Sequence, residues 1–280
     1  MTLFGRIDRA SWGWLHLEGR ERCPFLAGYL PSLPHESFHP SIATSSGRAA
    51  LEAGFQTYKI IKRELRKHGR PLQPADAVLD FGCGWGRITR YFTRDVQPEN
   101  LWGIDISETA IEACRETNRW ARFEQNSPLP PAPFEDETFD LIYAYAVFSH
   151  LSEASHLAWL QEFERVLKPG GLFVATTLPR HFAENSSKLA HRDPGSLPEW
   201  QRQVAECFAA PDEFLAAYDR GDYSFAEIDG AEDYLGFASI SEQYVRRRWA
   251  ERFEVRDYFP GPRNMQMFIV CRKRGQPSNV

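Results

Sequence analysis

The spacing of apolar residues first predicts a long helix near the start of the chain. From Gly47 to His68, apolar residues recur at steps of three and four, the period of an amphipathic helix. Ser45 or Ser46 stands where a helix N-cap belongs, and Gly69 stands where the helix would end. The pattern therefore predicts a helix over 47–68.

Five short apolar runs follow this helix, and segments with helical spacing separate most of them. The runs predict buried strands at 77–82, 101–107, 121–126, 139–148 and 172–178. The intervening pattern predicts helices at 86–95, 108–120 and 152–167, the second capped by Ser107, and a turn at "KPGG", 168–171. Strands that alternate with helices predict a parallel sheet with right-handed crossovers, so the fold class is α/β, doubly wound.

The regular alternation stops after residue 178. Residues 179–238 predict irregular loops and short helices, and a helix returns at 241–253. Two closing strands are predicted at 254–259 and 265–273. The connector between them is too short for a parallel crossover, so this pair must be antiparallel. The opening stretch, 4–19, gives weaker signals and is interpreted as a hairpin.

Composition and charge narrow the class of protein. The 280 residues carry a formal net charge of −5 with a sequence pI near 5.9, which gives no general attraction to nucleic acid or anionic membrane. The five cysteines contain no C-x-x-C pair, so neither a disulfide framework nor a zinc site is indicated. The N-terminal stretch has no apolar h-region, and no apolar run reaches membrane-spanning length. We expect a soluble, cytoplasmic protein with no nucleic-acid or membrane partner.

The stretch "VLDFGCGWGR" places three alternate glycines directly after the first predicted strand. Gly82, Gly84 and Gly86 follow Asp80, at the end of the sheet where open α/β folds bind ligands. Glycine permits positive φ and lets the backbone approach a ligand closely. The spacing differs from the dinucleotide fingerprint G-x-G-x-x-G, and a carboxylate at position 80 suits a cationic ligand better than phosphates. A tight strand–helix turn without any ligand stays an open alternative.

A second carboxylate ends the second predicted strand. Asp105 lies 25 positions after Asp80 (105 − 80), where an acidic side chain can bind both hydroxyls of a ribose. An acid near a helix N-terminus could also be there only because the helix dipole favours it. Together with the glycine stretch, Asp105 indicates a ligand that contains a ribose and lacks a pyrophosphate.

These segments resemble the class I S-adenosylmethionine-dependent methyltransferases. "VLDFGCGWGR" resembles their glycine motif, "GIDIS" their acidic second-strand motif, and "FEDETFDLIYAYAVFSHL" and "RVLKPGGLFVATT" the segments around their fourth and fifth strands. The resemblance covers 45–178 closely and 238–273 more loosely. It implies a Rossmann-like sheet of seven strands in the order 3-2-1-4-5-7-6, the seventh antiparallel, with helices on both faces. It also implies an N-terminal extension (1–44) and a methyltransferase domain (45–280) that contains a helical lid at 179–238.

The resemblance also implies roles for individual residues, with S-adenosylmethionine as cofactor, S-adenosylhomocysteine as product and no metal. The methionine portion would be surrounded by Asp80, Gly82, Cys83, Gly84 and Gly86. Asp105 would bind the ribose and Ile106 would lie against the adenine. Asn126 and Ser127 stand where many members carry an acid for the adenine amino group. Ala144 would line the methyl side, and Arg48 is a candidate for the cofactor carboxylate.

Methyl transfer from a sulfonium is an in-line displacement that mainly needs alignment and exclusion of water. A base is required only when the acceptor is protonated at the working pH, as an alcohol is. His150, after the fourth strand, and His181, after the fifth, are the candidate bases, since imidazole titrates near neutral pH. Either histidine could instead only order its loop.

The acceptor is harder to predict. The segment 179–238 is rich in aromatic residues, which could form its own core or line a pocket; such a lid favours a small-molecule acceptor. A hydroxyl oxygen is preferred, and a nitrogen or a glycan-linked group is the alternative. A protein that binds S-adenosylmethionine without catalysis also stays open. A nicotinamide-dependent oxidoreductase is disfavoured by the glycine spacing.

Overall fold

The computed structural model describes residues 2, 4–19, 22–35, 47–228, 232 and 235–275. The chain divides into two compact units. The first comprises Met1–Ser127, Ala132–Tyr143 and Val166–Leu172, and the second comprises Pro128–Pro131, Ala144–Arg165 and Phe173–Val280. The division at residue 44 is a separate prediction, and these boundaries do not test it.

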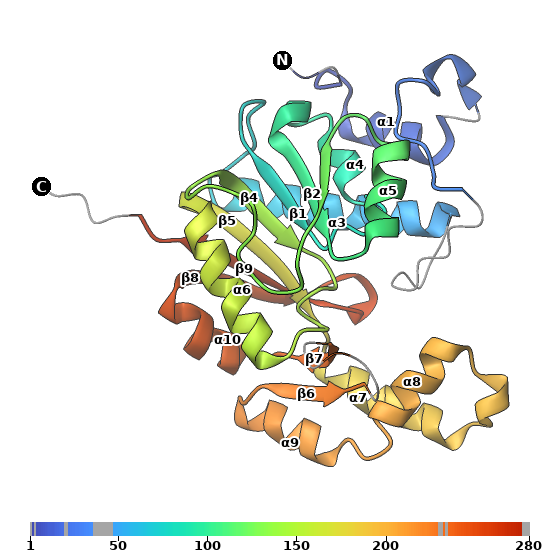
Figure 1. The fold of residues 1–280 in the computed structure, drawn as a ribbon, viewed down its shortest axis with the longest axis vertical. Helices are drawn as coiled ribbons and strands as arrows, with labels where there is room; N and C mark the ends of the chain where they lie inside the picture. Colours follow the sequence, from blue (N-terminus) through green and yellow to red (C-terminus); the bar gives the residue numbers. More distant parts are fainter. Residues whose placement is uncertain are drawn as a thin grey trace, which may run out of the picture. The chain divides into compact units, whose positions relative to one another are not determined.

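A seven-stranded sheet has the strand order β3-β2-β1-β4-β5-β9-β8 (Figure 1). The strands are β1 Val78–Phe81, β2 Leu101–Asp105, β3 Arg122–Gln125, β4 Phe139–Ala144, β5 Leu167–Thr177, β8 Phe253–Pro260 and β9 Met267–Lys273. Strand β1 pairs in parallel with β2 and β4, β2 pairs in parallel with β3, and β8 pairs antiparallel with β9. The order 3-2-1-4-5-7-6 predicted from the resemblance is therefore confirmed.

Strands β1 and β4 form the buried centre of this arrangement. Every residue of both strands is buried, which explains their continuous apolar runs. The register places Asp80 of β1 opposite Tyr143 of β4, and this pairing brings two polar side chains together inside an otherwise apolar region.

The helices follow the predicted alternation with some changes in length. They are α3 Gly47–Lys67, α4 Thr89–Phe92, α5 Glu108–Thr117, α6 Glu153–Val166 and α10 Glu242–Arg248. The helix predicted at 86–95 is observed only at Thr89–Phe92, and Gly86 lies outside it because its φ of 74° does not fit a right-handed helix. The "KPGG" segment, predicted as a turn, lies within β5, with Gly170 at a φ of 76°. The caps proposed for α3, Ser45 and Ser46, lie outside the described residues.

The N-terminal segment corrects the interpretation of 4–19 as a hairpin. Helix α1 (Arg9–Trp14) is followed by a π-helix at Leu15–Gly19. The Asp8 carboxylate accepts hydrogen bonds from Ala10 N and Ser11 N, which caps α1. The Trp12 indole is fully buried and donates to Tyr91 O at 3.0 Å. The aromatic residues that suggested strands therefore anchor a helix.

The segment after β5 contains helices α7 Arg180–Ser187, α8 Glu199–Cys207 and α9 Asp212–Arg220 (Figure 1). It also contains an antiparallel strand pair that the sequence interpretation missed, β6 Ser224–Glu227 and β7 Gly236–Ser239. Each of these strands has only four residues, too few to show a clear alternation. Their pairing depends on tertiary contacts.

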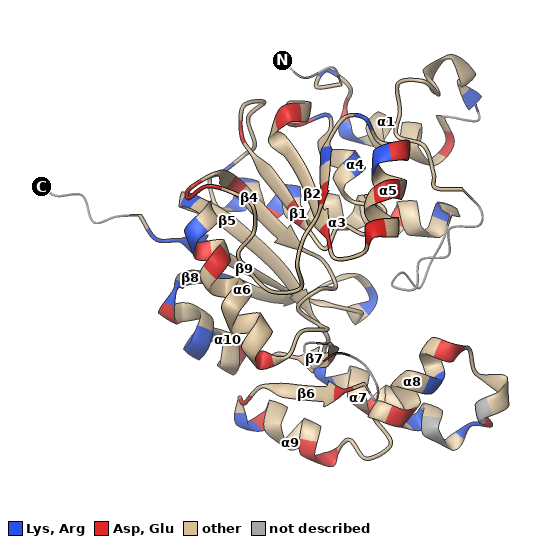
Figure 2. Cartoon of the chain, viewed as in Figure 1, with Lys and Arg blue, Asp and Glu red and all other residues tan. Residues whose placement is uncertain are grey.

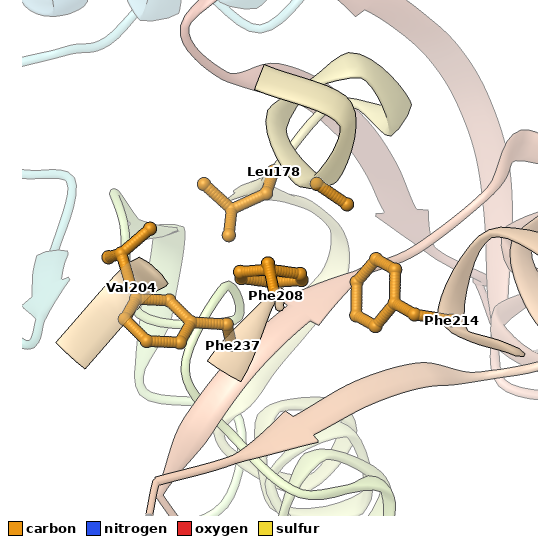
Figure 3. Packing of buried hydrophobic residues seen from close by; sticks show 6 residues of the cluster. Leu178, Val204, Phe208, Phe214 and Phe237 are labelled. Atoms are coloured by element: carbon orange, nitrogen blue, oxygen red, sulfur yellow. The ribbon is translucent and has the colours of Figure 1, made fainter. Parts of the chain in front are cut away.

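This segment, with the residues just before it, has a hydrophobic core of its own (Figure 3). Phe208 lies at its centre and is fully buried, with the rings of Phe214 and Phe237 at 5.1 and 5.8 Å. The remaining buried members are Leu178, Ala183 and Val204. Most of the prominent phenylalanines therefore pack against one another. Tyr234, also among the aromatic residues of this segment, lies outside the described residues.

Candidate functional site

The glycine loop after β1 has the backbone shape that its sequence predicts. Gly82, Gly84 and Gly86 have φ values of 69°, 53° and 74°, in the left-handed region that strains residues with a Cβ. The N–H groups of Gly82 and Cys83 both donate to Ile104 O, at 2.8 and 3.0 Å. A Cβ placed on Gly84 would meet no atom within 4 Å. The loop is thus tied to β2 and leaves open space beside Gly84.

Asp105 connects this loop to the end of β2. Its Oδ2 accepts a hydrogen bond from Gly84 N at 2.8 Å, and its Oδ1 accepts one from Ser107 N at 2.9 Å. The side chain is buried, and this burial raises the pKa of the carboxyl while the two backbone bonds oppose the rise. Asp105 is therefore fixed in orientation and retains lone pairs for further hydrogen bonds.

Asp80 lies at the same end of the sheet and is only 2% exposed. The hydroxyls of Thr89 and Tyr143 donate to its Oδ2 at 2.5 and 2.8 Å. Burial raises the pKa of Asp80 to about 7, and the two hydroxyl donors oppose this rise. A buried carboxyl that titrates near neutral pH is a frequent feature of functional sites.

Asn126 follows β3 in the same unit. Its backbone N–H donates to Asp105 O at 3.1 Å, and its Nδ2 donates to Ser127 O at 2.7 Å. This second bond fixes the amide so that Oδ1 is the remaining acceptor, and Oδ1 is buried with no hydrogen-bond partner in the described part of the chain. A buried acceptor left open in this way is costly unless a ligand or water meets it. Ile106, after β2, is 38% exposed.

The other predicted cofactor residues differ in their surroundings. Cys83 is buried in a small apolar cluster with Cys114 and Phe123, and burial raises the pKa of its thiol. Ala144 is buried at the end of β4. Arg48 lies at the start of α3 and forms ion pairs with Glu18 at 3.0 Å and Glu52 at 2.9 Å. The structure brings Asp80, the glycine loop, Asp105 and Asn126 together, whereas the contacts of Arg48 are with Glu18 and Glu52.

The two candidate bases belong to the second unit. His150 Nδ1 lies 3.0 Å from Gly236 O on β7. Because a carbonyl oxygen can only accept, Nδ1 carries the proton and Nε2 keeps its lone pair. Burial lowers the pKa of His150, which keeps the ring neutral at pH 7. His181 is half-buried in the first turn of α7.

Two contacts of Asp80 were missed by sequence reasoning. Thr89 was assigned only to a helix and Tyr143 only to a strand, although both donate to the Asp80 carboxylate. A polar residue within a continuous apolar run was the one available signal for Tyr143. Its partner could be found only from the strand register.

The distribution of charge and hydropathy over the described residues indicates no further site. Figure 2 shows acidic and basic residues on the same helices, for example on α5. Among the described residues, no helix is both long enough and apolar enough to cross a membrane. All five cysteines are free thiols.

Comparison with known proteins supports the class of protein that this geometry indicates. Residues 78–171 match the family described as "Methyltransferase domain". The chain is 31% identical over 136 residues to a fatty-acid O-methyltransferase of Mycolicibacterium smegmatis, covering 46% of this chain and 42% of the relative. It is 32% identical over 138 residues to a trans-aconitate 2-methyltransferase of Azoarcus, covering 48% of this chain and 50% of the relative. The chain thus spans half or less of the length of these curated relatives.

A crystal structure of a Pyrococcus horikoshii protein has the same fold, with a TM-score of 0.54 and 18% identity over 84% of this chain and 96% of that one. The strand order, the glycine loop and these matches agree. Residues 78–171 are thus similar to methyltransferase domains, and the strand order is that of the Rossmann-like sheet expected for the class I S-adenosylmethionine-dependent methyltransferases.

Proposed function

We propose that this protein transfers a methyl group from S-adenosylmethionine to an oxygen atom of a small-molecule acceptor. The observation that carries the proposal is the bond from Gly84 N to Asp105 Oδ2 at 2.8 Å. It joins the glycine loop to the carboxylate at the end of β2, so that one rigid group presents both a backbone surface and a ribose acceptor. A nucleoside fits both features, because an acidic side chain at this place can bind its ribose hydroxyls while the rest of the ligand lies along the glycine backbone.

Two further observations indicate that the described residues fit S-adenosylmethionine. The side of Gly84 that a Cβ would occupy is open, so a ligand can approach the backbone there. The Oδ1 of Asn126 is a buried acceptor without a partner in the described part of the chain. The adenine amino group is a donor of the right kind, and Asn126 would replace the acid that many members carry.

Each residue of the site then has a specific role. Asp105 binds the ribose hydroxyls, Ile106 packs on the adenine, and Asn126, with Ser127 beside it, binds the amino group. Asp80 attracts the ammonium of the methionine portion, which lies along the backbone of Gly82, Cys83, Gly84 and Gly86. Ala144 lies on the methyl side. Arg48 stays a candidate for the cofactor carboxylate and would have to exchange Glu18 or Glu52 for it.

The bound cofactor supplies a methyl group on a sulfonium, which an acceptor lone pair can displace. The protein holds the acceptor in line and excludes water, and it removes a proton where the acceptor carries one. His150 is suited to the last task, because Gly236 O holds its Nδ1–H and leaves Nε2 able to accept. His181 is the second candidate for the same task.

The candidate base His150 and a curated relative both bear on the class of acceptor. One relative is described as a fatty-acid O-methyltransferase, and the oxygens of a fatty acid belong to its carboxyl group. A carboxylate acceptor needs no base, whereas a hydroxyl acceptor does. The neutral His150 favours a hydroxyl. A nitrogen acceptor, a glycan-linked group and binding without catalysis are the competing possibilities. A cytoplasmic location stays a prediction from the cysteine pattern.

The first experiment is calorimetric titration of the protein with S-adenosylmethionine, S-adenosylhomocysteine and NADH in parallel. Micromolar binding of the first two without the third supports the cofactor assignment. Binding of NADH alone contradicts it. A methyl-transfer screen over alcohols, carboxylates and amines, read by S-adenosylhomocysteine release, then separates the acceptor classes, and binding without turnover on any of them supports the non-catalytic alternative.

A further inference from the structure

We propose that Thr89 and Tyr143 are positioning residues that act through Asp80. Their hydroxyls hold one oxygen of the carboxylate, so that the other oxygen is directed to the ammonium group of the cofactor. The inference rests on the proposed function and adds to it two residues that no part of the glycine motif specifies.

The fold brings the three side chains together from three separate elements. Asp80 on β1 and Tyr143 on β4 are partners in the parallel register, so their side chains lie on the same face of the sheet. Thr89 is the first residue of α4, nine positions after Asp80, and returns over that face. Thr89 and Tyr143 are fully buried and Asp80 is 2% exposed, so water cannot easily replace either hydroxyl.

The hydrogen bonds are unequally distributed over the carboxylate. Both hydroxyls donate to Oδ2, at 2.5 and 2.8 Å, and in the described residues these are the two hydrogen bonds that the side chain accepts. Short bonds of this kind are typical of a hydroxyl that donates to an ionised carboxylate. Tyr143 stays a donor, because burial raises the pKa of its phenol well above the usual range.

This arrangement makes a proton and the ammonium compete for one oxygen. Since Oδ2 already accepts two hydrogen bonds, a proton on Asp80 has to reside on Oδ1, where the cofactor ammonium would bind. Asp105 repels the ionised form of Asp80, Arg87 stabilises it, and the buried Cys83 thiol stays neutral beside it. The two hydroxyls add to the effect of Arg87. Removing either hydroxyl therefore raises the pKa of Asp80 from about 7 and weakens cofactor binding near neutral pH.

The experiment measures the Kd of S-adenosylhomocysteine from pH 5.5 to 8.5 for the wild type, Tyr143→Phe and Thr89→Val. Tyr91→Phe and Thr93→Val are matched controls, because each is a buried hydroxyl that donates to a backbone carbonyl, of Leu51 and Arg90 respectively. Thr89→Ser restores the donor. The probe 5′-methylthioadenosine, which lacks the ammonium, is titrated alongside and also reports whether each variant is folded.

We expect the ratio of variant to wild-type Kd to depend on pH. A rise of one unit in the pKa of Asp80 weakens S-adenosylhomocysteine binding about five-fold at pH 7 and by less than about two-fold at pH 8.5. Protonation of the ligand itself affects the variant and the wild-type Kd equally, so it does not change this ratio. Binding of 5′-methylthioadenosine should not change, and Thr89→Ser, Tyr91→Phe and Thr93→Val should behave like the wild type.

Three results would overturn the proposal, and they are distinguishable. An equal loss of affinity for both ligands at every pH would make the two hydroxyls purely structural. Unchanged affinity of Tyr143→Phe and Thr89→Val at pH 7 would remove them from any role in binding. If the wild type bound neither ligand, the proposed function itself would fail, and this inference would fail with it.

Discussion

The glycine loop, residues 82–86, and the segment after β5, residues 179–238, solve different physical problems. The loop is defined by backbone geometry: three glycines at positive φ and two carboxylates that bind hydroxyl and backbone donors. The later segment is defined by apolar packing around Phe208. Geometry of the first kind tolerates few residue types at each position, whereas a packed core tolerates many. This difference explains why the loop is recognisable in the sequence and the later segment is not.

The packing also limits what the later segment can contribute to a site. Phe208, Phe214 and Phe237 are buried in its core, and the ring of Phe237 also lies 5.6 Å from the ring of His150. Its clearest contact with a predicted site residue is a backbone one, from Gly236 O to His150. The segment would therefore influence the chemistry by holding a histidine in one tautomer.

The largest expected effect is on catalysis, and it tests the role of His150, the residue that this backbone contact holds. With an alcohol acceptor, His150→Ala should lower kcat by roughly 10²- to 10⁴-fold, the usual contribution of a general base. The Kd of S-adenosylhomocysteine should stay the same. Because burial lowers the pKa of His150, the wild-type kcat at saturating S-adenosylmethionine should be level near neutral pH and fall only below the ordinary range of histidine, as the base becomes protonated. His191→Ala, at an exposed position, is the control, and full activity of His150→Ala would end the assignment.

The packed core of the later segment gives the next largest effect. Phe208→Ala should lower the free energy of unfolding of this segment by about 3–5 kcal/mol, since it leaves a cavity among three aromatic rings. Limited proteolysis and denaturant titration measure this change. Phe25→Ala, at a side chain that is 76% exposed, should change stability by less than about 0.5 kcal/mol. The comparison between the two regions would be wrong if Phe208→Ala weakened cofactor binding while stability stayed unchanged.

In the glycine loop, the carboxylate of Asp105 should matter most. Asp105→Ala removes the ribose acceptor and leaves Gly84 N without its partner, so we expect roughly 100-fold weaker binding of S-adenosylhomocysteine in calorimetry. Asp76→Ala removes a carboxylate that, among the described residues, accepts one hydrogen bond, from Gln73 N at 2.7 Å, and should leave the affinity unaltered. Near-normal affinity of Asp105→Ala would take this residue out of the ribose site.

The smallest expected effect comes from two glycine substitutions, which together distinguish backbone strain from contact with the ligand. Gly84→Ala and Gly69→Ala both place a Cβ at positive φ with no atom within 4 Å, so each should lose about 1–2 kcal/mol of stability. Only Gly84→Ala should also weaken cofactor binding, by about ten-fold, because its Cβ enters the space assigned to the ligand. Thermal unfolding measures the loss of stability of the two variants, and calorimetry on the same samples measures their cofactor affinity. Equal cofactor affinity of the two variants would show that the open side of Gly84 does not face the ligand.

Much of the fold could be predicted from local patterns. The helix α3, the strands β1 to β5 and the antiparallel pair β8 and β9 lie where periodicity and connector length indicated. The Ser107 cap was also predicted and is confirmed by the bond from Ala110 N to its hydroxyl. Local prediction failed where aromatic residues were ambiguous, as in the helix that carries Trp12 and in the short pair β6 and β7.

By itself, the sequence determined the alternation of strands and helices, the left-handed glycine loop and the position of Asp105, because each depends on residues close together in the chain. Only the tertiary structure decided which side chains meet. Tyr143 reaches Asp80 across 63 positions, and His150 reaches Gly236 across 86. Strand register sets the first contact and the pairing of loops with β7 sets the second. Both depend on pairing between segments that are far apart in the chain, which no local pattern records.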